Sequence, residues 1–139
     1  MIVIDASVAI ELLLRTAAGR QLERGVLAAT ETLHAPHLLD LEVTQVLRRY
    51  LRVGELSVER GNEALQDLLD LPLNRYPHHL FLPRIWGLRD SATAYDAAYL
   101  ALAESLAAPL LTHRPPRPPE TRNRICFCGV HGHEHYYPR

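Results

Sequence analysis

The sequence predicts an α/β fold, a three-layer α/β/α arrangement in which a central, mainly parallel sheet of four strands lies between helices. Short apolar runs alternate along the chain with segments of helical periodicity. The first run, residues 1–4, is rich in aliphatic side chains and ends abruptly in Asp5. With 139 residues, 47% of them hydrophobic, the chain is long enough to form one core without disulfides.

Residues 1–4 predict a buried parallel strand that delivers Asp5 at its C-terminal end, where ligand sites gather in open α/β sheets. Asp5 has a second interpretation as the cap of the helix that begins near Ser7. Two helices are expected next, with Gly19 marking the break between them. Their apolar positions are Val8, Ile10, Leu12, Leu13 and Leu14, then Leu22, Val26 and Leu27.

Residues 32–36 predict a short second strand, in which Pro36 removes a hydrogen-bond donor on one side. The clearest helix of the chain follows and is expected to end at Gly54. Its apolar residues recur at i, i+4, i+7, i+8 and i+11, which is typical of an amphipathic helix. They are Leu39, Val43, Val46, Leu47 and Tyr50.

Ser57 is expected to cap the next helix, with Arg60 where a capping box usually has Glu. A third strand at 73–76, a short helix at 80–88 and a fourth strand at 109–112 follow. Between the last two, Thr93 predicts the N-cap of another helix. The predicted buried faces of the two capped helices are Leu65, Leu68 and Leu69, and Ala97, Ala98, Ala101 and Leu102.

Three carboxylates occupy related positions in this scheme. Asp5 follows the first strand, and Glu42 and Asp96 are each expected in the first turn of a helix. Helix N-termini and strand C-termini share one edge of a parallel layer, so the three acids are expected to converge. Crowded carboxylates repel one another unless a hard cation such as Mg²⁺ or Mn²⁺ neutralises them. Each acid also has a structural interpretation, because acids stabilise the first turn of a helix.

The order of these motifs resembles the PIN domain, and within it the VapC-type toxin ribonucleases of bacterial toxin–antitoxin pairs. The resemblance runs through residues 1–112, and the segment around Asp96 is its most specific part. It implies a PIN-like α/β/α domain that holds one or two Mg²⁺ or Mn²⁺ ions and hydrolyses RNA phosphodiesters. It also implies a cognate antitoxin, a homodimer and a role in controlling translation or growth. The segments that carry the resemblance are residues 2–7, 41–43, 93–104 and 110–112.

On this resemblance, Asp5, Glu42 and Asp96 are the catalytic acids that hold the metal. The hydroxyls of Ser7 and Thr112 would orient Asp5 or a coordinated water. Both hydroxyl residues also have a structural interpretation, Ser7 as a helix cap and Thr112 as an ordinary strand end.

The chain departs from the family after its fourth strand. The family pattern there is Thr, any residue, then a fourth Asp, but Thr112 is followed by His113 and Arg114. An Arg about 5 Å from a divalent ion would oppose it by roughly 6 to 7 kcal/mol at an effective dielectric constant of about 20, so Arg114 cannot replace the acid. His113 could offer Mn²⁺ a nitrogen ligand. Two functions stay open: a three-acid ribonuclease, or a catalytically impaired PIN-domain protein that binds antitoxin, a second protomer or RNA.

Residues 113–139 form a tail rich in Pro, Arg and His, which is expected to be irregular and to lack the family's closing strand. One hypothesis is that the tail is an out-of-frame reading of a GC-rich gene. Resequencing that finds a continuous frame, and no Thr-x-Asp with a closing strand in the neighbouring one, would contradict it. A second interpretation is a zinc site, although the spacing lacks paired knuckles. Its ligands would be Cys126, Cys128, His131, His133 and His135.

The overall charge indicates little about partners. The formal net charge is −1, so nothing global demands nucleic acid or an anionic membrane. Arg48, Arg49 and Arg52 are candidates for contacts to RNA phosphates, or they form a solvated helix face or the surface that an antitoxin covers. No apolar stretch is long enough to span a bilayer, and the acid at position 5 does not fit a secretory signal, so the expected location is the cytoplasm, with no membrane partner.

Overall fold

The computed structural model describes residues 1–25, 31–113 and 125–127. Strands and helices alternate along the chain, as the sequence predicts. In order they are β1 (Ile2–Ile4), α1 (Ala6–Leu13), α2 (Ala17–Gly25), β2 (Leu33–Pro36), α3 (Leu38–Arg52), α4 (Val58–Asp70), β3 (Leu73–Tyr76), a 3₁₀ helix (His78–Phe81), α5 (Leu82–Gly87), α6 (Ala94–Leu106), β4 (Leu110–Thr112) and β5 (Ile125–Phe127).

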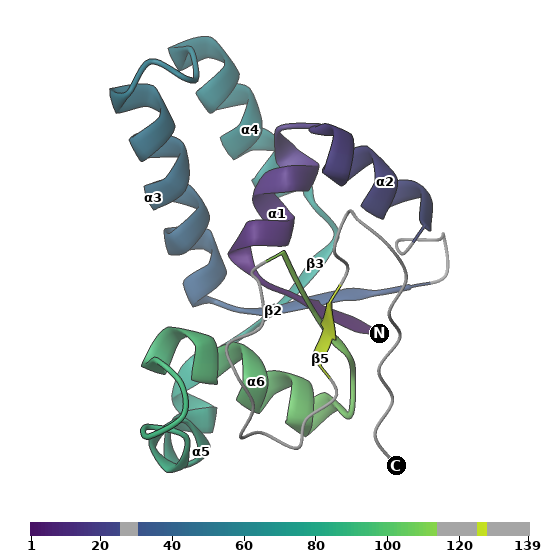
Figure 1. Cartoon of the computed structure of the whole chain (residues 1–139), viewed down its shortest axis with the longest axis vertical. Coiled ribbons are helices and arrows are strands. Elements are labelled where there is room, and N and C mark those ends of the chain that lie inside the picture. Colours follow the sequence, from purple (N-terminus) through teal and green to yellow (C-terminus); the bar gives the residue numbers. More distant parts are fainter. Residues whose placement is uncertain (26–30, 114–124, 128–139) are drawn as a thin grey trace.

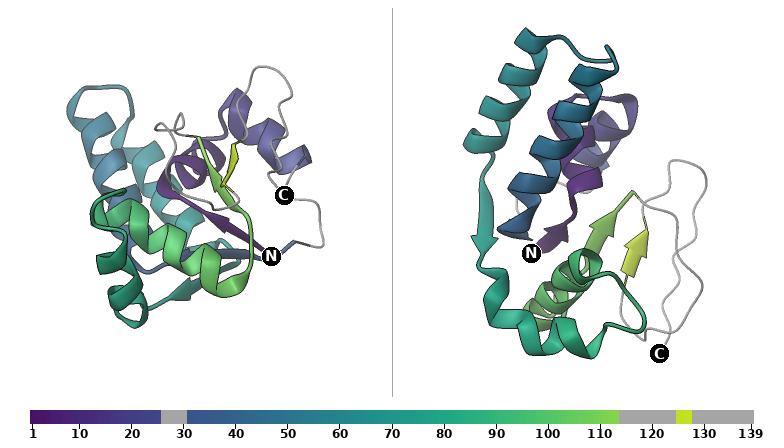
Figure 2. Two further views of the ribbon diagram at one scale, coloured as in Figure 1. Left: turned by 60° about the horizontal axis from the view of Figure 1, so that its bottom comes forward. Right: turned by 90° about the vertical axis from the view of Figure 1, so that its left-hand side faces the viewer.

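The sheet is parallel, with strand order β3-β2-β1-β4-β5. β1 is buried along its whole length, and Val3 is opposite His34 on one side and Leu110 on the other. Helices α1 to α4 lie on one side of the sheet, and α5 and α6 lie on the other (Figure 1). The side view in Figure 2 shows the same three layers, so the predicted α/β/α architecture is confirmed.

The four predicted strands form the β3-β2-β1-β4 part of the sheet, and β5 adds a fifth beside β4. The expectation that no strand follows residue 112 is therefore wrong. The strand has only three residues and follows a proline-rich stretch, which is why the sequence favoured an irregular chain there. The domain boundary after residue 112 stays a prediction. Val26, Leu27, Arg114 and the side chains of the proposed zinc ligands lie outside what the structure describes, namely Cys126, Cys128, His131, His133 and His135.

The predicted helix caps are present. The Asp5 side chain accepts a hydrogen bond from the Val8 amide and caps α1. Ser57 caps α4, and Thr93 caps α6. Just beyond α3, Gly54 has φ of +76°, a left-handed conformation that suits glycine at a helix end. These features are local, which is why the sequence predicts them.

The prediction that Gly19 separates two helices is wrong. The break falls at Arg15, whose φ is +52°, and Gly19 lies inside α2. A Cβ built on Gly19 would come within 2.0 Å of the Glu11 carbonyl oxygen. Glycine therefore serves the close approach of α2 to α1 and does not end a helix.

The predicted buried face of α4 is also partly wrong. Leu68 is buried, but its companions on the buried stripe are Gly61 and Ala64. Leu65 and Leu69 are 40% and 65% exposed. The reason is the position of α4, which packs on α1 and α3, so only a narrow stripe is covered.

Two smaller differences concern helix boundaries. Helix α3 begins at Leu38, so Asp40 is the acid of its first turn and Glu42 lies one residue beyond that turn. Asp40 forms an ion pair with Arg75 on β3, with 2.9 Å between the Asp40 Oδ2 and the Arg75 Nε. The helix expected at 80–88 is divided into a 3₁₀ turn and α5. Among the described residues, no helix combines the length and apolarity needed to cross a membrane.

Candidate functional site

Asp5 is the buried centre of the candidate site. Its carboxylate is in a side chain only 7% exposed, at the end of the central strand. Oδ1 accepts hydrogen bonds from the Ser7 hydroxyl at 2.5 Å and the Val8 amide at 3.1 Å, and Oδ2 accepts one from the Thr112 hydroxyl at 2.6 Å. Ser7 and Thr112, the two hydroxyl residues that were expected to orient Asp5, therefore both bond its carboxylate. Asp5 also caps α1, which was its second interpretation.

Ser7 connects this carboxylate to the chain after β4. Its Oγ donates to Asp5 and accepts the His113 backbone N–H at 2.9 Å. Since Thr112 also bonds Asp5, the end of β4 is attached to the start of α1 at two adjacent residues. These two hydrogen bonds fix the position of the chain just after β4. In the family pattern, the fourth acid would follow at this point.

Glu42 is held from the opposite layer of the fold. Its Oε2 accepts a hydrogen bond from the Tyr99 hydroxyl at 2.5 Å. Tyr99 is 3% exposed and belongs to α6, 57 residues away in sequence. Sequence reasoning did not identify this tyrosine, although its position three residues after Asp96 puts the two on one helix face.

Asp96 lies in the first turn of α6, as predicted, and is half-buried. The Thr93 hydroxyl accepts the Asp96 backbone N–H at 3.1 Å and donates to Asp96 Oδ2 at 2.8 Å. The N-cap therefore fixes both the helix start and the orientation of the acid.

A groove of about 970 Å³ opens beside these acids, within the size range of ligand sites. We call it the α1–α3 groove, because most of its lining comes from those two helices, with Tyr95 and His113 at its edge. Glu42 and Ser7 line it directly, whereas Asp5 and Asp96 do not: Asp5 is bonded to Ser7, and Asp96 follows Tyr95 in the sequence. Of the three arginines singled out in the sequence, Arg49 lines the groove, and Arg48 and Arg52 do not.

The donor chemistry of the acids fits a hard divalent cation, since all three offer carboxylate oxygens. Within residues 1–25, 31–113 and 125–127, however, no three His, Cys, Asp or Glu side chains lie close enough to hold one ion among them. Mg²⁺ commonly binds through one or two carboxylates and completes its shell with water and substrate phosphate. The acids are therefore compatible with such an ion as a partial set of ligands, not as a closed cage.

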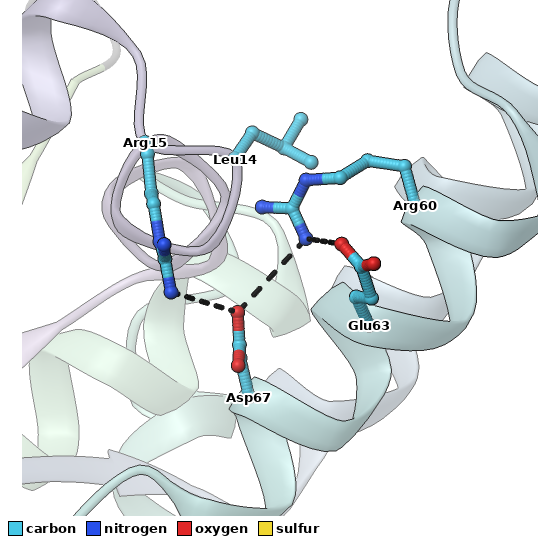
Figure 3. A pocket seen from close by; sticks show the side chains of 5 residues that line it. All are labelled: Leu14, Arg15, Arg60, Glu63 and Asp67. Carbon is cyan, nitrogen blue, oxygen red and sulfur yellow. Dashed lines mark hydrogen bonds and ion pairs between the residues drawn. The ribbon is translucent and has the colours of Figure 1, made fainter.

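A second pocket of about 250 Å³ lies between α1 and α4 (Figure 3). Its contacts show what Arg60 does at the position where a capping box usually has Glu. Asp67 Oδ2 is 3.8 Å from Arg15 and 3.9 Å from Arg60, which also lies 3.4 Å from Glu63. Arg60 additionally donates to the Leu13 carbonyl at the end of α1. A cation at that end satisfies a free carbonyl and the helix dipole, so Arg60 joins the two helices.

Comparisons with known proteins agree with the fold. The PIN domain family matches residues 2–114. Ribonuclease VapC9 of Mycobacterium tuberculosis is 44% identical over 112 residues, which are 81% of this chain and 84% of the relative.

Two solved structures are similar in fold. The crystal structure of Mycobacterium tuberculosis VapC20, a sarcin-ricin loop cleaving toxin, has a TM-score of 0.60 at 14% identity and covers 79% of this chain and 87% of that one. That of VapBC2 from Rickettsia felis, bound to a DNA fragment from their promoter, has a TM-score of 0.57 at 12% identity, with 82% and 89% covered. At these identities the likeness concerns the fold alone.

Proposed function

This chain belongs to the PIN domain family, among its VapC-type members, and from that premise we propose that it is a metal-dependent endoribonuclease toxin that hydrolyses RNA phosphodiester bonds. The observation that carries the proposal is the buried Asp5 carboxylate, held by two hydroxyls at the end of the central strand beside an open groove. Such placement suits a group that acts on a substrate lying in the groove.

Asp5, Glu42 and Asp96 are the proposed acids of the metal site, of which one or two would bind the Mg²⁺ or Mn²⁺ ion while water and the RNA phosphate complete its shell. When bound, the ion supplies positive charge that stabilises the developing negative charge on the phosphate. Each acid has its own hydroxyl support: Asp5 from Ser7 and Thr112, Glu42 from Tyr99, and Asp96 from Thr93. A hydroxyl donor restricts the rotation of a carboxylate without adding charge, so these bonds orient the acids and leave their negative charge for the cation.

Ser7 and Thr112 hold Asp5 from two sides. The Asp5 side chain also accepts the Val8 amide, so its rotamer is fixed by the helix cap and by the neighbouring strand together. Loss of the Thr112 hydroxyl would remove the donor to Oδ2 of this buried carboxylate, which costs about 1–3 kcal/mol, whereas Oδ1 would keep the Val8 amide if the Ser7 hydroxyl were lost. The two hydroxyls therefore serve the site and the fold at once.

A second candidate function is an impaired PIN-domain protein that binds antitoxin, a second protomer or RNA without cutting. The observation that favours it is Arg114, which stands where the family pattern has its fourth acid. The three remaining acids favour the ribonuclease as the first candidate.

The family membership also supports proposals about partners and location. We expect an RNA substrate, a cognate antitoxin protein and a homodimer, and we expect the protein to act in the cytoplasm. Co-expression of the chain with the product of an adjacent gene, followed by size-exclusion chromatography with light scattering, would test the two protein partners. A monomer that is unchanged by that product would contradict them.

The direct test is cleavage of a mixed RNA substrate by the purified chain with Mg²⁺ or Mn²⁺. We expect cleavage that requires the metal and falls roughly 100-fold or more in Asp5→Asn. Asparagine keeps the shape, and its amide can donate to the Thr112 hydroxyl, so the cap should survive.

Arg114→Asp separates the two candidate functions. If the parent does not cleave RNA and Arg114→Asp does, the protein is a nuclease disabled at that position. If both proteins are folded and neither cleaves RNA, the ribonuclease proposal is contradicted and binding remains as the function.

A further inference from the structure

The α1–α3 groove carries one cation and two tyrosines in addition to Glu42. We propose that it holds a single-stranded stretch of RNA beside the acids, with Arg49 contacting a backbone phosphate and Tyr95 stacking on a base. The inference rests on the proposed function, because it describes how the substrate of that site would be held.

The geometry of α3 sets the distance along the helix between Glu42 and Arg49. Glu42, Val46 and Arg49 lie at i, i+4 and i+7, on one face of the helix, and all three line the groove. Seven residues of helix span about 10 Å, so the guanidinium side of the groove is well separated from Glu42. A strand that has one phosphodiester at the acids would therefore carry a different phosphate past Arg49.

The positive charge of Arg49 is not neutralised by the described chain. Among residues 1–25, 31–113 and 125–127, no carboxylate oxygen lies within 4.0 Å of its guanidinium nitrogens. The guanidinium lies over the ring of Tyr50, with its Cζ 5.5 Å from the ring centroid. This stacking holds the planar cation in place before a ligand arrives, which reduces the entropy lost when it binds a phosphate.

The acids of the groove form hydrogen bonds with other residues and no ion pair with Arg49. The Glu11 carboxylate accepts the Thr16 hydroxyl, and Glu42 accepts the Tyr99 hydroxyl. These bonds turn each carboxylate toward its own donor. A strand of RNA in the groove would therefore meet negative charge near Glu42, where the metal ion is proposed to bind, and positive charge near Arg49.

Tyr95 supplies an aromatic surface at the edge of the groove. It precedes Asp96, lines the groove, and is 63% exposed although it is a large aromatic residue. An aromatic side chain that is this exposed contributes little to the core. Bases stack on such rings with little sequence preference, so Tyr95 fits an unpaired base next to the scissile bond.

The chain offers matched controls for Arg49 on the same helix. Arg48 and Arg52 are exposed residues of α3 and carry the same charge, but neither lines the groove. Removing any of the three changes the net charge equally. A difference between them therefore reports the groove and not the overall charge of the protein.

The test measures the affinity of the full chain for a short, fluorescently labelled single-stranded RNA of mixed sequence, with Asp96→Asn present to prevent cleavage. Arg49→Ala should weaken binding roughly tenfold and lower the slope of log affinity against log salt by about 0.7. Arg48→Ala and Arg52→Ala should each stay within about twofold. Tyr95→Ala should weaken binding roughly tenfold, and Tyr95→Phe should stay within about twofold.

Equal losses in the three arginine variants would overturn the proposal, and so would the absence of RNA binding by the folded parent. Equal losses in Tyr95→Phe and Tyr95→Ala would overturn its base-stacking part. Weaker binding of an added antitoxin to Arg49→Ala, with RNA affinity unchanged, would assign the groove to a protein instead. The proposed function fails separately, through RNA cleavage that does not depend on Asp5.

Discussion

Helices α4 and α6 are both 13 residues long and are both capped by a hydroxyl side chain, yet they bury very different surfaces. Residues 97–103 of α6 are buried without interruption, whereas α4 buries Gly61, Ala64 and Leu68. The reason is the layer that each helix occupies. Helix α6 contacts β1, β2 and β4, while α4 packs on α1 and α3 (Figures 1 and 2). Equal length and similar capping therefore do not determine how much of a helix is buried.

The comparison also bears on the site. Helix α6 carries Asp96 and Tyr99, and its position against the sheet brings the Tyr99 hydroxyl to Glu42 of the other layer. Helix α4 is joined to the end of α1 by the Arg15–Asp67 ion pair and by the hydrogen bond from Arg60 to the Leu13 carbonyl, and it carries none of the proposed acids. A rigid, fully packed helix suits residues that must be held accurately, whereas the outer helix tolerates exposed leucines.

The largest expected effect would test the difference in burial. Leu102→Ala in α6 should lower the free energy of unfolding by about 3–5 kcal/mol, because Leu102 is fully buried and a cavity would remain. Leu69→Ala in α4 should change it by about 0.5 kcal/mol or less, since Leu69 is 65% exposed. Urea unfolding measures both. Similar losses in the two variants would contradict the layer argument.

A smaller effect concerns the hydroxyl that α6 provides to Glu42. Tyr99→Phe should reduce RNA cleavage roughly tenfold, because Glu42 loses the donor that orients it. Unfolding should become easier by about 1–2 kcal/mol. A rise in the Mn²⁺ concentration needed for half-maximal cleavage would separate this positioning role from a loss of stability. Tyr76→Phe, which removes a hydroxyl bonded to His34, is the control, and cleavage should be retained.

The two helix caps provide a finer comparison. Ser57→Ala and Thr93→Ala should each cost about 1 kcal/mol of stability, because each removes an acceptor for a backbone N–H at a helix start. Cleavage should fall in Thr93→Ala alone, since the Thr93 hydroxyl also donates to Asp96. Parallel assays of unfolding and cleavage would show this, and an equal loss of cleavage in both variants would count against it.

The smallest effect lies in the sheet, away from both helix caps. His34 is buried on β2, with its ring nitrogens 2.9 Å from the Tyr76 hydroxyl and 2.8 Å from that of Thr32. Burial, and secondarily the N-terminal ammonium, lower the pKa of His34 below 6.5. The unfolded chain therefore binds a proton at a higher pH than the folded chain does.

The stability that His34 contributes is consequently complete above about pH 6.5 and is lost as the pH falls through its lowered folded pKa. The free energy of unfolding should therefore decline more steeply below pH 6.5 in the parent than in His34→Gln. Urea unfolding across a pH series measures the two slopes. Identical slopes would show that His34 does not contribute.

Much of the fold and part of the site follow from the sequence alone. The strands at Ile2–Ile4 and Leu110–Thr112 were predicted from short apolar runs, and Asp5, Ser57 and Thr93 were recognised as caps. These features depend on residues a few positions apart, so local chemistry determines them. The position of Asp5 at the end of the first strand belongs to the same class.

Tertiary structure decided what depends on distant segments. The hydrogen bond between Glu42 and Tyr99 joins residues 57 apart, and the Asp5–Thr112 bond joins residues 107 apart. The close approach of α2 to α1 at Gly19 and the exposure of Leu65 likewise depend on which helices pack against each other. Periodicity indicates which face of a helix is apolar, but only the packing of the layers determines whether that face is covered and which acids acquire hydroxyl partners.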